Sequence, residues 1–276
     1  MTGRRHATSG LPWLVLLLTV LVMPARPAWA TEHDDAWARL RDRSLEAVAT
    51  LAAARPEPGG VSEVEGPSVV IVGFTGGLER RDSRVSGVVR MHRAITAHVG
   101  PTDDVLSMTY SNFKWRQAVS EVRRIVQERD DQRPRPLVIV YGHSWGAGAI
   151  TKFGRALHAD GIDIALAVYI DTFTLRQPKV PANVRFAVNL YQRTGILRGL
   201  PLRGKKTLRP DDPEATVILG SLRITPRTEH FGWNWNLVQP LLYRQHHRIG
   251  HDVRLREYLI DLVEQTRRSL AVRNPV

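Results

Sequence analysis

Cysteine is missing from all 276 residues of the chain. A disulfide framework and a lipidated cysteine are therefore both excluded, and an oxidising compartment poses no hazard. Long apolar runs are scarce as well, and the one from Leu11 to Met23 is short for a membrane span. The remaining composition is ordinary, with 43% apolar and 24% charged residues. It predicts a globular chain with one substantial core and one main domain.

Acidic residues are outnumbered, with 27 Asp and Glu against 39 Lys and Arg, for a formal charge of +12. Residues 1–30 hold three of the arginines and no acid, so the rest of the chain carries 36 basic against 27 acidic residues, or +9. This balance favours an anionic envelope surface as partner, such as lipid headgroups or acidic polymers. A solvated basic surface is the alternative. Nucleic acid is not expected, because no aromatic-interleaved basic cluster stands out.

The amino terminus has the pattern of a secretory signal peptide over residues 1–30. Arg4 and Arg5 precede the apolar run, and Ala28-Trp29-Ala30 forms an A-x-A cleavage site. We expect cleavage near Ala30 and a periplasmic or extracellular protein. A retained membrane anchor is the alternative, and the arginine pair leaves twin-arginine export open.

Three segments are predicted along the chain. Residues 1–30 form the signal, and residues 31–66 form a helical segment that ends in a Pro/Gly linker at Pro56 to Gly60. Residues 67–276 form the main domain, in which short apolar strands alternate with amphipathic helices. Such alternation predicts a parallel sheet with helices on both faces, and ligand chemistry at the carboxyl ends of the strands.

A candidate nucleophile lies between a predicted strand at residues 137–141 and a predicted helix at residues 147–157. The motif there is Gly142-His143-Ser144-Trp145-Gly146. A serine on so tight a turn has a strained backbone, and its neighbours must be nearly free of side chains for strand and helix to approach. An ordinary glycine-rich strand-to-helix turn is the alternative. The following apolar helix and the later acid and histidine favour the nucleophile.

The acid and the base should follow Ser144 in that order. Asp171 directly ends the next predicted strand, residues 164–170, so it belongs to the same sheet edge. Asp211 and Asp212, in a Pro-flanked loop, are rival acids. The late histidines before the last helix are candidate bases: His246, His247 and His251. With Asp252 they also suggest a metal site, but no cysteine or early histidine pair completes one, and no metal is expected.

An oxyanion hole is expected beside the serine. The N–H of Trp145 supplies the first donor, and the turn from Gly73 to Gly77 supplies the second from Phe74 or Thr75. A phosphate-binding loop is the rival interpretation of this turn. It lacks both the Gly-x-x-x-x-Gly-Lys-Ser/Thr and the Gly-x-Gly-x-x-Gly spacing.

Several motifs together resemble an α/β-hydrolase family of exported, mostly uncharacterised bacterial serine hydrolases that are lipase- or thioesterase-like. The resemblance extends from Val69 to Leu262 and rests on GFTGGLERRDSRVSGVV, VIVYGHSWGAGA, AVYIDTF, VPANVRFAVNLYQ, ATVILGSLRI and HHRIGHDVRL. The family's spacing of histidine, isoleucine and aspartate places the base on His246, and its Ile-Asp pair places the acid on Asp171. Gly148 and Ala149 depart from the family's usual second glycine and small polar residue, which we interpret as packing variation.

The resemblance implies an α/β-hydrolase fold, and hydrolysis of a carboxyl ester or thioester by Ser144, His246 and Asp171 without a cofactor. Only about a dozen residues separate Asp171 from the next predicted strand, which is too few for a large cap. The substrate would be a small-molecule or lipid-like acyl compound. Apolar residues before His246 form either an acyl pocket or core: Phe231, Trp233, Trp235, Leu237, Leu241, Leu242 and Tyr243. The alternatives are a catalytically silent fold that binds the envelope, or a depolymerase or acyltransferase acting on envelope polymers.

Overall fold

The computed structural model describes residues 28–55, 66–77, 79–80, 82–83, 86–102, 104–129, 134–192, 204–225, 246 and 248–271. The expected signal segment up to residue 27 and the Pro/Gly linker lie outside these residues. The chain forms two compact units, Met1–Ala38 and Arg39–Val276. Helix α2 (Ala28–Ala53) begins in the first unit and ends in the second, and all other described elements belong to the second.

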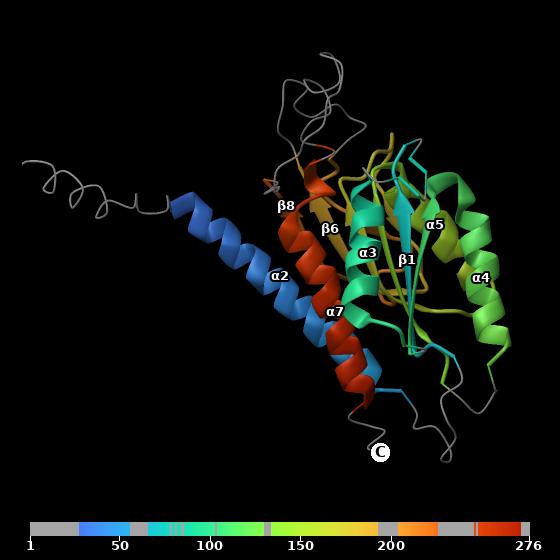
Figure 1. Cartoon of the computed structure of the whole chain (residues 1–276). Helices are drawn as coiled ribbons and strands as arrows, with labels where there is room; N and C mark the ends of the chain where they lie inside the picture. The colour runs from blue at the N-terminus through green and yellow to red at the C-terminus, as the bar shows by residue number, and fades with distance from the viewer. Residues whose placement is uncertain are drawn as a thin grey trace, which may run out of the picture. The chain divides into compact units, whose positions relative to one another are not determined.

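A six-stranded sheet forms the centre of the second unit (Figure 1). Its order is β2-β1-β3-β4-β6-β8, and every neighbouring pair is parallel. The strands are β1 (Val69–Thr75), β2 (Val105–Ser111), β3 (Leu137–His143), β4 (Ile164–Ile170), β6 (Val184–Tyr191) and β8 (Val217–Arg223). The short strands β5 (Lys179–Val180) and β7 (Arg209–Pro210) pair separately. The chain passes outward from β1 to β2 and then back to β3, so the strand order reverses between β1 and β3. Open parallel sheets bind ligands at such a point.

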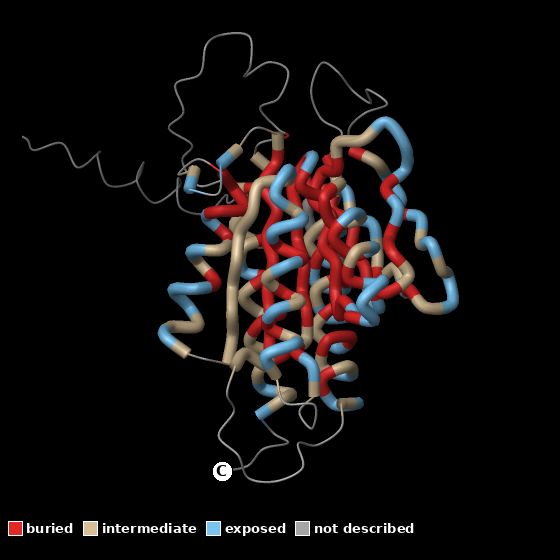
Figure 2. The backbone as a smooth tube through the Cα atoms, turned by 90° about the vertical axis from the view of Figure 1, so that its right-hand side faces the viewer, coloured by how far each residue is buried: buried red, intermediate tan, exposed pale blue. Residues whose placement is uncertain are grey.

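Helices cover both faces of the sheet. Helices α4 (Trp115–Gln127) and α5 (Trp145–His158) pack on one face, and α3 (Gly87–Val99) and α7 (Val253–Ala271) pack on the other. The central strands β1, β3 and β4 are therefore buried almost throughout, whereas the edge strand β2 is only half-buried (Figure 2). The mostly parallel sheet with helices on both faces confirms the predicted architecture.

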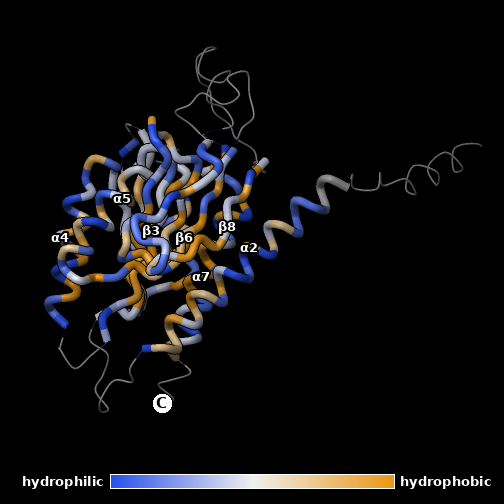
Figure 3. Tube along the Cα trace, turned by 180° about the vertical axis from the view of Figure 1, so that it is seen from behind, coloured by the Kyte–Doolittle hydropathy of each residue, from blue (hydrophilic) through white to orange (hydrophobic). Residues whose placement is uncertain are grey.

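The side chains of β1 alternate between the two helical layers, as side chains of a strand must. Val70, Val72 and Phe74 join the core cluster beneath α4 and α5. Helix α4 places its apolar residues on that core and its charged residues outward, and its turns alternate between hydrophobic and hydrophilic colour in Figure 3. Among the described residues, no helix combines the length and the apolar character that crossing a membrane requires.

Helix α3 begins at Gly87, directly after its N-cap residue Ser86. A Cβ atom on Gly87 would lie 2.1 Å from the carbonyl oxygen of Gly250. The start of α3 therefore contacts the segment before α7 backbone to backbone. This contact helps to position the stretch that carries His246.

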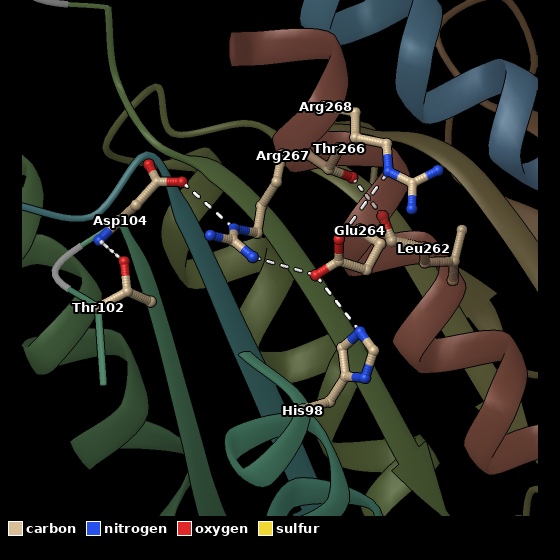
Figure 4. Close-up of polar contacts among 8 residues, drawn as sticks. All are labelled: His98, Thr102, Asp104, Leu262, Glu264, Thr266, Arg267 and Arg268. Carbon is tan, nitrogen blue, oxygen red and sulfur yellow. Dashed lines mark hydrogen bonds and ion pairs between the residues drawn. The ribbon is translucent and has the colours of Figure 1, made fainter. Parts of the chain in front are cut away.

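A cluster of polar side chains connects α3, α7 and the residue directly before β2 (Figure 4). Glu264 of α7 accepts a hydrogen bond from Arg267 Nη1 at 3.0 Å and lies 3.4 Å from His98 Nε2 of α3. Arg267 Nε also lies 3.6 Å from Asp104, the residue before β2. The cluster lies at the amino ends of the strands, opposite the edge at which ligand chemistry is expected. Exposed ion pairs of this kind stabilise a fold only modestly.

From its middle onward, helix α2 packs against β8 and α7. Leu40 is buried, and a Cβ on Gly220 of β8 would lie 2.8 Å from its Cδ1 atom. Arg41 Nε donates to Asp261 Oδ2 of α7 at 2.8 Å. From Arg39 onward, therefore, this helix is part of the second unit.

Candidate active site

Ser144 lies on a sharp turn between β3 and α5. Its φ is 60° and its ψ is −121°, a conformation that residues other than glycine rarely adopt. Its N–H donates to the Ile170 carbonyl at 3.0 Å, and its own carbonyl accepts from the Phe173 N–H at 3.2 Å. The strained serine is thus attached by backbone hydrogen bonds to the chain on either side of Asp171.

The two flanking glycines of the motif are required by close backbone contacts. A Cβ on Gly142 would lie 2.6 Å from the carbonyl carbon of Gly146. A Cβ on Gly146 would lie 2.1 Å from the carbonyl oxygen of Phe74 in β1. Gly148, in contrast, has open space around its Cβ position. The Gly-x-Ser-x-Gly spacing therefore has a steric origin, whereas no close contact requires a glycine at position 148.

The structure brings the predicted serine, histidine and aspartate into one hydrogen-bonded chain. Ser144 Oγ lies 2.8 Å from His246 Nε2, and His246 Nδ1 lies 2.6 Å from Asp171 Oδ2. Their exposed fractions are 7%, 4% and 0% for Ser144, His246 and Asp171. Because a carboxylate only accepts, the imidazole proton belongs on Nδ1, which leaves Nε2 to accept from the hydroxyl. This is the arrangement that a serine nucleophile needs.

Asp171 is held in place by a residue that sequence reasoning missed. The backbone N–H of Gln192 donates to Oδ1 at 3.2 Å, and its side-chain Nε2 donates to Oδ2 at 3.1 Å. Asp171 follows β4, and Gln192 follows β6, the adjacent parallel strand. The one available signal was that both residues come directly after neighbouring strands of the predicted sheet.

His143, which occupies the position between Gly142 and Ser144 in the motif, contacts the proposed base. Its Nε2 lies 2.8 Å from the carbonyl oxygen of His246, and the two rings lie 4.6 Å apart at an angle of 33°. Since a carbonyl only accepts, Nε2 of His143 carries a proton. His143 is 3% exposed, so this contact is buried. Sequence reasoning assigned His143 no role although it lies inside the motif.

The rival acids form other interactions. Arg155 Nη2 donates to Asp211 at 2.8 Å, and Lys179 Nζ lies 3.5 Å from the same carboxylate. Asp212 Oδ1 accepts from the backbone N–H groups of Glu214 and Ala215 at 2.9 and 3.3 Å. Asp211 therefore forms ion pairs and Asp212 closes a turn.

Of the two remaining late histidines, only His251 lies among the described residues. His251 Nδ1 lies 3.4 Å from Arg90 Nη1 on α3, and the neighbouring Asp252 accepts from the Arg254 N–H at 3.0 Å, as a cap of α7 does. His247 lies outside the described residues, as do the apolar residues 231–243 proposed as an acyl pocket. Within the described part of the chain, no group of three or more His, Asp or Glu side chains is placed to hold a metal ion.

The end of β1 lies against the serine. Phe74 is inside the ladder, opposite Tyr110 and Gly142, whereas Thr75 is the last residue of the strand. A Cβ on Gly76 would lie 2.8 Å from Ser144 Cβ, so the backbone here touches the nucleophile. Trp145 is the first residue of α5, and its N–H has no acceptor within the helix. Both expected sources of oxyanion donors therefore lie beside Ser144.

Glu79 is a second residue that sequence reasoning missed. Burial raises the pKa of its carboxyl group, while hydrogen bonds with the Ser86 side chain and the Gly76 backbone, and the nearby charge of His246, act in the opposite direction. Its backbone N–H donates to Gly76 at 3.0 Å, and its carbonyl accepts from the Thr75 hydroxyl at 2.9 Å. Glu79 thus holds the turn that contacts the nucleophile.

The parallel sheet, its helical layers and the strained serine after β3 define the α/β-hydrolase class of fold. No protein-family model matches the chain, and no curated protein matches its sequence.

Three solved structures to which the chain is similar are distant from it in sequence. The RedJ thioesterase of the prodiginine pathway in Streptomyces coelicolor matches 43% of this chain and 46% of its own, at 13% identity and a TM-score of 0.28. A cutinase-like protein from Cryptococcus sp. matches 75% of this chain and 98% of its own, at 14% identity and a TM-score of 0.34. A metagenomic carboxyl esterase matches 76% and 79%, at 13% identity and a TM-score of 0.37.

Proposed function

We propose that this protein is an exported serine hydrolase that cleaves an ester-type bond, a carboxyl ester or a thioester, through an acyl-enzyme. The observation that carries the proposal is the continuous hydrogen-bonded chain from Ser144 Oγ through His246 to Asp171, with links of 2.8 and 2.6 Å. A buried serine on a strained turn, paired with an oriented imidazole, is the usual device for activating a hydroxyl. Export rests on the signal-like pattern of residues 1–30.

The first half of the reaction acylates the serine. His246 Nε2 takes the hydroxyl proton as Ser144 Oγ attacks the substrate carbonyl, and Asp171 stabilises the imidazolium and its orientation. The N–H of Trp145 and a second N–H from Phe74 or Thr75 bind the oxyanion. Collapse of the tetrahedral intermediate breaks the ester bond, and His246 returns the proton to the leaving alcohol or thiol.

The second half releases the acyl group. Water loses a proton to His246 and attacks the acyl-serine, and the second tetrahedral intermediate expels Ser144 Oγ, which regains the proton. The products are a carboxylic acid and the alcohol or thiol. Besides the substrate and water, the proposed steps use Ser144, His246, Asp171 and the backbone N–H groups of the expected oxyanion hole.

Replacement of the nucleophile tests the proposal. We predict that Ser144→Ala abolishes both labelling by a fluorophosphonate probe and hydrolysis of p-nitrophenyl acetate, with a loss of roughly 10⁴-fold or more in kcat. Circular dichroism and thermal unfolding should show an intact fold.

Two histidine variants provide a matched comparison. His246→Ala should lose the base and with it most of the rate, while His251→Ala, which removes the contact with Arg90, should keep most of it. A folded wild-type protein that neither reacts with the probe nor hydrolyses the ester would contradict the proposal and favour a catalytically silent fold.

A further inference from the structure

Three aromatic side chains form a partly exposed strip at the carboxyl edge of the sheet. Phe113 is 60% exposed and Trp145 is 41% exposed. The ring centroids of Phe113 and Trp145 are 6.4 Å apart with an interplanar angle of 83°, and those of Trp145 and Phe173 are 6.0 Å apart at 60°. We call Phe113, Trp145 and Phe173 the aromatic strip. Contiguous exposed apolar surface of this kind usually marks a binding site.

The strip is fixed to the nucleophile through the backbone. Trp145 directly follows Ser144, and the Phe173 N–H donates to the Ser144 carbonyl at 3.2 Å. Phe113 belongs to the short helix η1 (Asn112–Lys114), which follows β2 and packs against α5. All three rings are therefore held on ordered elements at a set position relative to Ser144 Oγ. A surface that is ordered before binding loses little entropy when a ligand arrives.

The outer end of the strip borders a cavity of ligand size. Phe113 forms part of the wall of a cavity of about 670 Å³. The rest of the wall is mostly polar and consists of Glu79, Arg80, Asp82, Tyr110, Ser111, Lys114 and Gln117. Small-molecule sites typically have volumes of this order. A group that lies on the strip therefore has room to extend beyond Phe113.

The position of the base indicates which part of an ester the strip would contact. The leaving group must lie beside His246 Nε2, which protonates it. The His246 ring stacks on His143, the residue before Ser144, whereas the strip is built around Trp145, the residue after it. Of the two parts of the ester, the acyl group is therefore the candidate ligand of the strip at Trp145.

We propose that the aromatic strip binds the acyl group of the substrate and selects esters whose acyl chain carries a bulky, preferably aromatic, apolar end. This inference rests on the proposed hydrolase function and names the substrate class of that site. A phenyl ring that buries roughly 100 Å² of apolar surface on the strip gains, at about 25 cal/mol per Å², between tenfold and a hundredfold in kcat/KM.

The experiment compares two p-nitrophenyl esters with the full chain, the 3-phenylpropanoate and the acetate. A two-carbon spacer insulates the carbonyl from the ring, so the two esters differ little in intrinsic reactivity. Wild-type protein should prefer the phenylpropanoate at least tenfold in kcat/KM. Phe113→Ala should remove most of this preference, measured as the ratio of the two kcat/KM values, and Phe113→Tyr, which keeps a ring, should retain it.

Val217→Ala is the matched control, because Val217 is an apolar side chain on β8 that is also exposed, by 51%. It should change neither ester. Acetate hydrolysis without any preference in the wild type, or a preference that survives Phe113→Ala, would overturn the inference and leave the hydrolase proposal intact. An unchanged preference together with a dimer that Phe113→Ala dissociates would instead identify the strip as a contact between two copies. Absence of both probe labelling and acetate hydrolysis would overturn the function itself, and this inference with it.

Discussion

The carboxylate of Asp171 accepts three hydrogen bonds in a fully buried position, from His246 and from two groups of Gln192. The three donors hold both carboxylate oxygens, so the carboxylate is kept in position to orient the imidazole. The support comes from the strand next to the one that carries the aspartate. The acid is therefore positioned by the sheet as well as by its own turn.

Replacement of this carboxylate by an amide should impair catalysis without altering the fold. We predict that Asp171→Asn lowers kcat by a factor on the order of 10⁴, because the amide no longer stabilises the tautomer with the proton on Nδ1. The steady-state rate on p-nitrophenyl acetate measures the effect. Asp212→Asn is the control, since asparagine can still cap the turn at Glu214. A large loss of kcat in Asp212→Asn with little change in Asp171→Asn would show that the catalytic acid is Asp212, in the later loop.

The buried carboxyl group of Glu79 should make stability depend on pH. Burial raises its pKa above the ordinary value of 4.5, so the folded state binds the proton more tightly than the unfolded state. The contribution of this pKa difference to the free energy of unfolding is fully present below pH 4.5. It is lost as the pH rises through the folded-state pKa.

Glu79→Gln removes this dependence because glutamine does not ionise. We predict that the variant gains free energy of unfolding relative to wild type at pH 8 and gains nothing at pH 4, as measured by urea unfolding at both values. An equal difference at the two pH values would show that the group does not titrate differently on folding.

At the scale of elements, close backbone contacts hold β3, α5 and β1 together at one junction. Gly146 of α5 contacts the Phe74 carbonyl of β1, a strand with neighbours on both sides, so neither partner can move far. The same contact places the start of α5 against the end of β1. In this way the position of the serine turn is coupled to the position of the expected oxyanion donors.

Two glycines of α5 provide a matched test of this junction. Gly146→Ala should destabilise the protein by about 2–3 kcal/mol or prevent folding, because its Cβ would lie 2.1 Å from a carbonyl oxygen. Gly148→Ala should stabilise it by about 0.5–1 kcal/mol, because a helical glycine with open space gains helix propensity. Urea unfolding and soluble yield measure both effects. Similar results for the two variants would contradict the steric origin of the motif.

At the scale of the whole molecule, the site is assembled where the strand order reverses. The end of β1 provides the turn at Gly76, β3 leads to Ser144, β4 leads to Asp171, and His246 comes from the stretch before α7. Parallel strands bring their carboxyl ends to one edge, so residues far apart in the chain meet there. The polar cluster of Figure 4 lies at the other edge, where it joins the helices of one face without taking part in the site.

The basic character of the chain predicts a salt-dependent affinity for anionic surfaces. With +9 outside residues 1–30, the protein should bind vesicles that contain phosphatidylglycerol at low salt and dissociate as the ionic strength rises. The Debye length falls from about 30 Å at 0.01 M to about 3 Å at 1 M, which screens such an attraction. Vesicle sedimentation measures the binding, and neutral phosphatidylcholine vesicles are the control. Binding to neutral vesicles, or binding that persists at 1 M salt, would show that charge is not the cause.

Local features were readable from the sequence because they depend on neighbouring residues. The apolar run before Gly142 and the spacing of small residues around Ser144 predict a strand, a turn and a helix, since backbone conformation and side-chain period are properties of consecutive residues. The alternation of strands and helices likewise predicts the parallel sheet, because parallel neighbours need a crossover between them.

Only the tertiary structure decided which side chains surround the nucleophile. Gln192 reaches Asp171, and His143 reaches the carbonyl of His246, through contacts that depend on strand order and on the path of the chain after β8. The aromatic strip likewise unites residues from η1, α5 and the loop after β4. Nothing in the spacing of these residues specifies such contacts, because the pairing of strands, and not the distance along the chain, determines which side chains meet.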